Sequence, residues 1–279
     1  MVARDVSSRS LADLYSLNER VALVTGGGRG LGAAIAARLA EAGASIAIAD
    51  VDMVLAKETA EKLAAGGATA IAVHMDVTSP ESTIEAVQSI RDQLGEIDIL
   101  INNAGLLGIP SPYNEIKDED FNRVIAVNVR GVLNVSRVVA PLMVAAGREG
   151  VIINIASTAS FRVPNPGTII YTTSKHAVNA ITKGLAVELG PQGIRVLDIA
   201  PVMVETPGLL ELRERSVQKA RESGETVELG NPAAFADLPL GRNANEDDVA
   251  RVVTFAASDA AILMTGCTLA VDAGSMVVK

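Results

Sequence analysis

Residues 21–32, VALVTGGGRGLG, decide the fold of this chain. An apolar run, VALV, leads into a turn with glycines at Gly26, Gly30 and Gly32, and the turn opens an apolar helical stretch over 31–42. The first amides of a helix are unpaired donors at the positive end of its dipole, so this arrangement favours a bound pyrophosphate. A glycine cluster can also be a turn that merely needs positive φ, and the neighbouring residues must decide between the two interpretations.

The next apolar run supplies that context. Residues 45–49 lead into Asp50, 18 residues beyond Gly32, where a βαβ dinucleotide site places the carboxylate that accepts the ribose hydroxyls. Asp50 would repel a 2′-phosphate, and 51–56 contain no Lys or Arg to compensate. The sequence therefore predicts NAD in preference to NADP, with Arg29 as the residue that opposes this prediction because it can face the phosphate.

Strand-like and helical patterns alternate along the whole chain. This alternation predicts an α/β fold, a Rossmann-type doubly wound seven-stranded parallel sheet in one domain. The domain is expected over 19–279, after an N-terminal extension over 1–18. Strands are predicted at 21–24, 45–49, 70–74, 97–101, 151–156, 194–199 and 267–271, and helices at 31–42, 53–65, 80–94, 118–146 with a break near Gly131, 171–189 and 246–257.

Composition limits the partners and the location. The 279 residues are 49% hydrophobic but only 3% aromatic, as expected for an aliphatic core around strands buried on both faces. A net charge of −9 argues against nucleic acid or an anionic membrane as partner. Cys267 is the one cysteine, and 1–20 lack the apolar core of a signal peptide, so we expect a soluble cytoplasmic protein.

Two further segments point to a lid and to a partner surface. Residues 207–240 are charged, poorly periodic and come directly after the loop that follows the sixth strand, which predicts an inserted lid that closes over substrate. The helices at 131–146 and 171–189 carry more aliphatic residues than one face against a sheet can use, which predicts contact with another subunit.

Several motifs in order resemble the short-chain dehydrogenases/reductases over roughly 19–274. They are Thr25-Gly26 with Gly30 and Gly32, the NNAG of 102–105, Asn128, Ser157, and Tyr171 with Lys175. The glycine and Tyr-Lys intervals resemble the short oxidoreductase branch. The resemblance implies nicotinamide-dependent hydride transfer between an alcohol and a ketone, in a homotetramer.

The resemblance also assigns residues. It implies a catalytic set of Asn128, Ser157, Tyr171 and Lys175, in which Asn128 holds a helix bulge and a proton-relaying water. One departure is Val202, which follows Pro201 where the family usually has glycine. The implied cofactor contacts are Gly26, Arg29, Gly30, Leu31, Gly32, Asp50, Asp76, Val77, Asn103, Ala104, Gly105, Tyr171, Lys175, Pro201, Val204 and Thr206, where Asp76 could instead be a strand-end cap.

The chemistry of the Tyr-Lys pair can be argued from the side chains alone. Oxidising a secondary alcohol needs a base, and free tyrosine has a pKa of about 10. Lys175 falls on the same helix face as Tyr171, so its cation favours the phenolate. Lowering the pKa of the Tyr171 phenol by about 3 units takes on the order of 4 kcal/mol, which needs the positive nicotinamide ring as well. Ser157 can donate to the substrate oxygen.

Alternatives remain at this stage. Tyr113 and Lys117 repeat the Tyr-Lys spacing but follow Pro112 in a loop, which favours a surface pair. His74 and His176 lack metal-ligand spacing and are predicted to be structural. A catalytically inactive dinucleotide-sensing module would use the same fold, whereas a serine hydrolase is disfavoured because Ser157 lies in no nucleophile elbow. The substrate stays open among secondary alcohols, polyols, sugars and cyclic diols.

Overall fold

The computed structural model describes residues 3–211, 214, 217 and 238–277. Seven parallel strands form one sheet in the order β3-β2-β1-β4-β5-β6-β7, so the predicted doubly wound α/β fold is confirmed. The strands are β1 Val21–Thr25, β2 Ser45–Asp50, β3 Ala70–His74, β4 Ile99–Asn102, β5 Gly150–Ile155, β6 Ile194–Pro201 and β7 Thr268–Val271.

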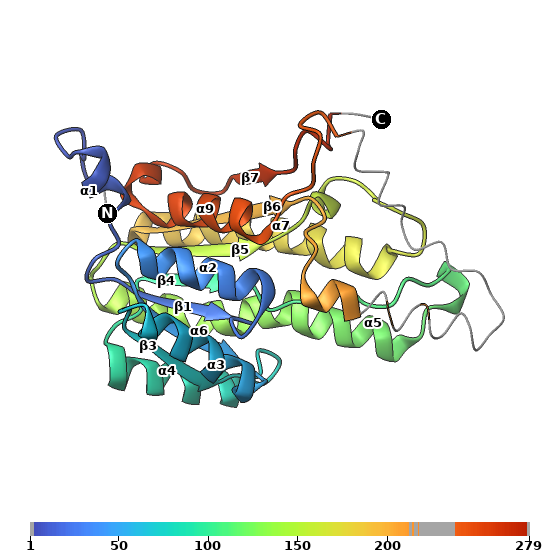
Figure 1. Cartoon of the computed structure of the whole chain (residues 1–279), viewed down its shortest axis with the longest axis horizontal. Helices are drawn as coiled ribbons and strands as arrows, with labels where there is room; N and C mark the ends of the chain where they lie inside the picture. The colour runs from blue at the N-terminus through green and yellow to red at the C-terminus, as the bar shows by residue number, and fades with distance from the viewer. Residues whose placement is uncertain (1–2, 212–213, 215–216, 218–237, 278–279) are drawn as a thin grey trace.

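Helices cover both faces of this sheet, with α2 and α9 on one side and α4 and α6 on the other (Figure 1). Alternate residues of each strand enter two cores: Ala22 and Val24 of β1 pack toward α2 and α9, whereas Val21 and Leu23 pack toward α4 and α6. The α-helices are α1 Leu11–Tyr15, α2 Gly30–Glu41, α3 Met53–Ala65, α4 Pro80–Leu94, α5 Asp118–Ile125, α6 Gly131–Ala145, α7 Ile169–Leu189 and α9 Glu246–Ala257.

Helix ends follow the capping signals in the sequence. The Ser79 hydroxyl accepts from the amide of Ser82, and Pro80 occupies the first turn of α4. Asn245 and Asp248 form a reciprocal capping box at the start of α9. The predicted boundaries of α3, α4 and β3 coincide with the observed ones.

The reversal of strand order lies between β1 and β4. In doubly wound sheets a ligand binds at this point, outside the carboxyl ends of the strands. Thr25 joins the two ends, because its hydroxyl oxygen accepts from the amides of Asn103 (3.0 Å) and Ala104 (3.1 Å). The Asn103 amide in turn donates to the carbonyls of Thr25 and Gly26, which fixes the glycine turn against β4.

The α-helix is interrupted just before Gly131, where the sequence predicted a break. Residues Ala126–Arg130 form a π-helical segment between α5 and α6, and the Gly131 amide closes it on the carbonyl of Ala126, so the helix continues. Gly131 serves close packing, because a Cβ there would lie 2.7 Å from Cγ2 of Val77. By length and composition Asp118–Ala145 could cross a membrane, but half of its apolar window is buried within the fold.

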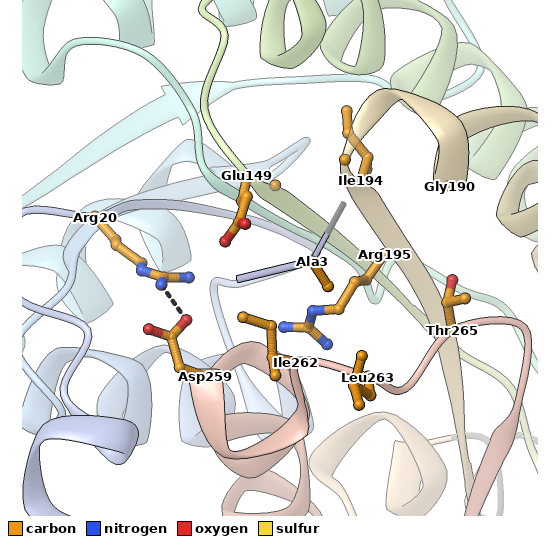
Figure 2. A pocket seen from close by; sticks show the side chains of 12 residues that line it. Ala3, Arg20, Glu149, Gly190, Ile194, Arg195, Asp259, Ile262, Leu263 and Thr265 are labelled. Carbon is orange, nitrogen blue, oxygen red and sulfur yellow. Dashed lines mark hydrogen bonds and ion pairs between the residues drawn. The ribbon is translucent and has the colours of Figure 1, made fainter. Parts of the chain in front are cut away.

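The N-terminal extension is tied to the far end of the sheet. Arg4, Arg9 and Arg20 all pair with the carboxylate of Asp259, at 2.5 Å for Arg20. A cavity of about 160 Å³ lies beside this cluster, with the Arg20–Asp259 pair on one side and Arg195 on the other (Figure 2). The Arg195 guanidinium donates to the carbonyl of Ala256 at 2.8 Å, so it caps the end of α9.

The predicted lid lies largely outside the described residues. Residues 207–211 are helical, and Leu238 is buried where the described chain resumes.

Candidate active site

A groove of about 370 Å³ opens at the carboxyl ends of the strands, where the strand order reverses. The lining comes from the glycine turn, the ends of β2, β3 and β4, the π-helical segment, and the segment after β6. Twelve predicted cofactor contacts are among them: Gly26, Arg29, Gly30, Leu31, Gly32, Asp50, Asp76, Val77, Asn103, Ala104, Gly105 and Thr206. Val51, Met75, Leu106, Val127 and Gly208, which the sequence did not indicate, complete the lining.

The glycine turn leaves no room for side chains. Gly26 and Gly30 have φ of +61° and +54°, which favour glycine. A Cβ on Gly32 would lie 2.1 Å from the carbonyl oxygen of Gly26, and one on Gly26 would lie 2.9 Å from Cα of Ala104. Backbone therefore packs on backbone between this turn, the start of α2 and the end of β4, and the groove floor is a cradle for an anion.

Two acidic side chains mark one end of the groove. Asp50 Oδ2 accepts from the amide of Gly28 at 3.0 Å, which orients the carboxylate at the end of β2. Asp76 Oδ1 accepts from both the amide and the hydroxyl of Thr78, at 2.8 and 2.7 Å. Asp76 thus caps its own turn while also lining the groove, and the two interpretations of this residue are compatible.

Ser157, Tyr171 and Lys175 come together beyond Gly105. Ser157 follows β5, and its hydroxyl oxygen accepts from the amide of Ala159 at 3.1 Å. Lys175, one helical turn after Tyr171 on α7, has its Nζ 5.8 Å from the centre of the tyrosine ring. A Cβ on Gly105 would lie 3.7 Å from that Nζ, so the cluster adjoins the groove.

Burial governs the protonation of this cluster. Burial raises the pKa of the Tyr171 phenol, and a hydrogen bond from the Ser157 side chain opposes the shift. Burial lowers the pKa of Lys175 to about 8, and the nearby Asp198 carboxyl opposes it. Lys175 Nζ donates to the carbonyl of Ile155 at 2.7 Å. Without a cofactor, the environment of Tyr171 thus disfavours the phenolate that a base requires.

Asn128 lies inside the π-helical segment and is 1% exposed. Its Oδ1 accepts from the amide of Leu106 at 2.7 Å, while its Nδ2 donates to the Leu106 carbonyl at 2.8 Å and to the Ser174 hydroxyl at 2.9 Å. The Ser174 hydroxyl then donates to the carbonyl of Tyr171. Asn128 therefore joins the groove wall after β4 to the helix that carries Tyr171.

Comparison with known proteins agrees with this geometry. A family model described as short chain dehydrogenase matches residues 20–216. The chain belongs to the short chain dehydrogenase family. It is 36% identical to 4-formylbenzenesulfonate dehydrogenase TsaC1/TsaC2 of Comamonas testosteroni, over 93% of this chain and 98% of the relative.

Solved structures in the family differ in their cofactor. A gluconate 5-dehydrogenase from Burkholderia cenocepacia, solved with NADP and tartrate, has a TM-score of 0.85 and 33% identity, covering 97% of this chain and 100% of that one. A 3-ketoacyl-(acyl-carrier-protein) reductase from Brucella melitensis, complexed with NADH, has a TM-score of 0.82 and 35% identity, covering 93% and 99%. Both neighbours were solved with a nicotinamide dinucleotide, and the backbone cradle of Gly26 and Gly32 in this chain would fit a ligand of that class.

The segment at the end of β6 holds two family-implied cofactor contacts, Pro201 and Val204, and the departure from the family at Val202. Pro201 ends β6 and Val204 forms a bridge with Ala244, and neither residue is among those that line the groove. Val202 is 7% exposed and its amide donates to the carbonyl of Val271 at 3.0 Å. The valine is thus part of the core between β6 and β7, which accounts for an apolar residue there.

The sequence analysis missed Asp198. Asn102, Asn154, Asp198 and Thr268 stand in register across four neighbouring strands, β4 to β7, as a polar row in which the first three residues are buried. Asp198 is 0% exposed, accepts from the Asn179 amide at 3.0 Å, and has a pKa raised by burial. A lone acidic residue in the apolar run of β6 was the available signal.

The competing candidates separate clearly from this site. Tyr113 is 80% exposed on a short 3₁₀ turn, as expected for a surface residue. The ring of His176 contacts the carbonyl of Thr172 within its own helix. Among the residues that the structure describes, no group of three His, Cys, Asp or Glu side chains is placed to hold a metal.

Proposed function

We propose that this family member transfers a hydride between a secondary alcohol and a nicotinamide cofactor, with Tyr171 as acid/base. The observation that carries the proposal is the convergence of Ser157, Tyr171 and Lys175 beside Gly105, at the edge of the dinucleotide groove. An inactive dinucleotide-sensing module is disfavoured, because such a module has no need of all three groups in contact.

The residues divide the chemistry between them. When bound, the nicotinamide supplies the hydride acceptor for alcohol oxidation. The Tyr171 oxygen takes the hydroxyl proton, and the Ser157 hydroxyl donates to the substrate oxygen as negative charge develops there. Because burial alone raises the pKa of Tyr171, the compensating charge must come from Lys175 and the oxidised nicotinamide ring. Lys175, with a pKa of about 8, keeps that charge at neutral pH.

Asn128 acts on this unit as a positioning residue. Its three hydrogen bonds hold the π-helical segment against Leu106 and Ser174, and so fix the start of α7. Its role in a water-mediated proton relay to Lys175 belongs to this proposal.

NAD is the proposed cofactor. The Asp50 carboxylate, which accepts from the Gly28 amide and lines the groove, would accept the adenosine ribose hydroxyls and repel a 2′-phosphate. Asp76 and Val77, which line the same end, would contact the adenine. A kcat/KM with NADP comparable to that with NAD would contradict this preference. Asp50→Ala should reduce the ratio of kcat/KM with NAD to kcat/KM with NADP.

Assembly as a cytoplasmic homotetramer completes the proposal. Exposed apolar side chains on α7, with Val187 at 76% and Ile169 at 45%, offer surface for a second subunit. A monomeric mass in solution at micromolar concentration would refute the assembly.

The decisive experiment for the activity is a substrate panel. Secondary alcohols, polyols, sugars and cyclic diols, assayed with NAD and with NADP for reduced-nicotinamide absorbance, should yield turnover with at least one class, and Tyr171→Phe should abolish it. Tight NADH binding without turnover across the panel would favour the sensing module instead.

A further inference from the structure

Arg29, in the glycine turn, pairs with a carboxylate from a distant segment. Its Nη2 lies 3.2 Å from Oε2 of Glu211, and its Nη1 contacts Oε1, so the pair is bidentate. Glu211 belongs to the helical residues 207–211, directly after Thr206 of the groove lining. Both side chains are partly exposed, at 44% and 46%. This contact joins the cofactor turn to the chain segment that follows β6.

Arg29 directly follows Gly28, whose amide donates to Asp50, and both Arg29 and Asp50 line the groove. The pKa of Arg29 is raised first by the hydrogen bond with Glu211, and the carboxylates of Asp50 and Asp52 act in the same direction. Asp50 is the residue proposed to accept the ribose hydroxyls. On that assignment of Asp50, the Arg29 guanidinium is the cation that a ribose 2′-phosphate would use.

A guanidinium fork binds one planar or tetrahedral oxyanion bidentately at a time. Glu211 occupies the edge of Arg29 formed by Nη1 and Nη2, so a 2′-phosphate that binds this edge must displace Glu211, whereas a free ribose 2′-hydroxyl leaves the pair intact. We propose that Glu211 is a specificity-determining residue, which occupies the Arg29 guanidinium and so disfavours dinucleotides with a 2′-phosphate. This inference rests on the proposed dinucleotide binding in the groove and adds a second discriminating carboxylate to Asp50.

The size of the effect follows from the exposure of the pair. Half-exposed ion pairs shift an equilibrium by about two- to fivefold. Glu211→Gln keeps the size and polarity of the side chain but removes its charge. We expect it to tighten NADPH binding by about two- to fivefold and to change NADH binding by less than about twofold.

Glu214 provides a matched control. It is exposed on the same helical segment, three residues on, so Glu214→Gln removes the same charge from nearly the same place. If Glu211 acts only by general repulsion of the anionic cofactors, removing either carboxylate should tighten the binding of NADPH and NADH to a similar extent. Displacement of a specific partner predicts an effect of Glu211→Gln alone, and one that vanishes in an Arg29→Gln background.

The test is a fluorescence titration of NADH and NADPH against the parent protein, the two single Gln variants, Arg29→Gln and the Arg29→Gln/Glu211→Gln double variant. A selective NADPH gain in Glu211→Gln that Arg29→Gln removes supports the inference. An unchanged NADPH/NADH ratio, an equal gain in Glu214→Gln, or the same gain without Arg29 overturns it. The readout is a change in ratio on mutation, so it holds whichever cofactor the parent prefers and whether or not turnover is found.

Discussion

Gly32→Ala probes the cofactor cradle most sharply, because the structure sets the size of the clash. The new Cβ would lie 2.1 Å from the carbonyl oxygen of Gly26 and 2.6 Å from Nδ2 of Asn103. Both atoms belong to one hydrogen bond, 2.9 Å long, which clamps the glycine turn to β4. Relief requires the carbonyl to move by roughly 1 Å, since real Cβ contacts stay beyond 3.0 Å, and overpacking of this kind costs about 1–3 kcal/mol.

The functional loss should exceed the loss of stability. Displacing the turn removes at least one amide donor from the pyrophosphate, and a hydrogen bond to a charged group contributes about 1.5–3 kcal/mol. NADH affinity, measured by fluorescence titration, should therefore fall by about tenfold to a hundredfold. Gly184→Ala is the control, because that glycine is exposed in α7 with nothing within 4 Å of its Cβ position. NADH binding by Gly32→Ala within twofold of the parent would refute the cradle.

Three further changes test other parts of the structure. Ser157→Ala should lower kcat by about 10²–10³ with little change in NADH affinity, because an oxyanion donor is lost. Asp198→Asn should gain stability relative to the parent as pH rises above about 4. The pKa of Asp198 is raised in the folded state, so the parent loses stability as the pH rises from the unfolded pKa to the folded pKa, and Oδ1 has no hydrogen-bond partner that Asn would lose. Urea unfolding at pH 5 and pH 8 measures the stability difference between Asp198→Asn and the parent. The same difference at both pH values would contradict the prediction. Asp259→Asn should weaken the hold on Arg4, Arg9 and Arg20, so trypsin should cut after Arg9 faster than in the parent; equal rates would show that the ion pairs do not anchor the extension.

Most of the fold could be predicted from signals that lie within a few residues of one another in the sequence. Ser79 with Pro80 fixes the start of α4, and the run over 70–74 fixes β3, because caps and apolar patterns act over a few residues. The π-helical segment at Asn128 depends instead on Leu106 and Ser174, which are distant in sequence. The long apolar pattern over 118–146 looks the same with or without such a bulge.

The site divides in the same way. The glycines, Asp50 and the Tyr171–Lys175 pair could be recognised because their spacing within one segment carries the chemistry. Asp198 acts through strand register, and Glu211 reaches Arg29 across 182 residues of chain. Neither the register of Asp198 nor the pairing of Glu211 with Arg29 produces a repeating pattern in the sequence, so both become visible only in the folded structure.

The most direct test of the central claim is turnover by Tyr171→Phe, measured together with NADH binding. The phenylalanine ring keeps the packing on α7 and removes only the ionisable oxygen, so alcohol oxidation should disappear while NADH affinity stays within about twofold. Tyr113→Phe, which alters the exposed tyrosine of the second Tyr-Lys spacing, should leave the rate unchanged. Substantial activity in Tyr171→Phe, or a larger loss in Tyr113→Phe, would contradict the assignment of Tyr171 as the acid/base.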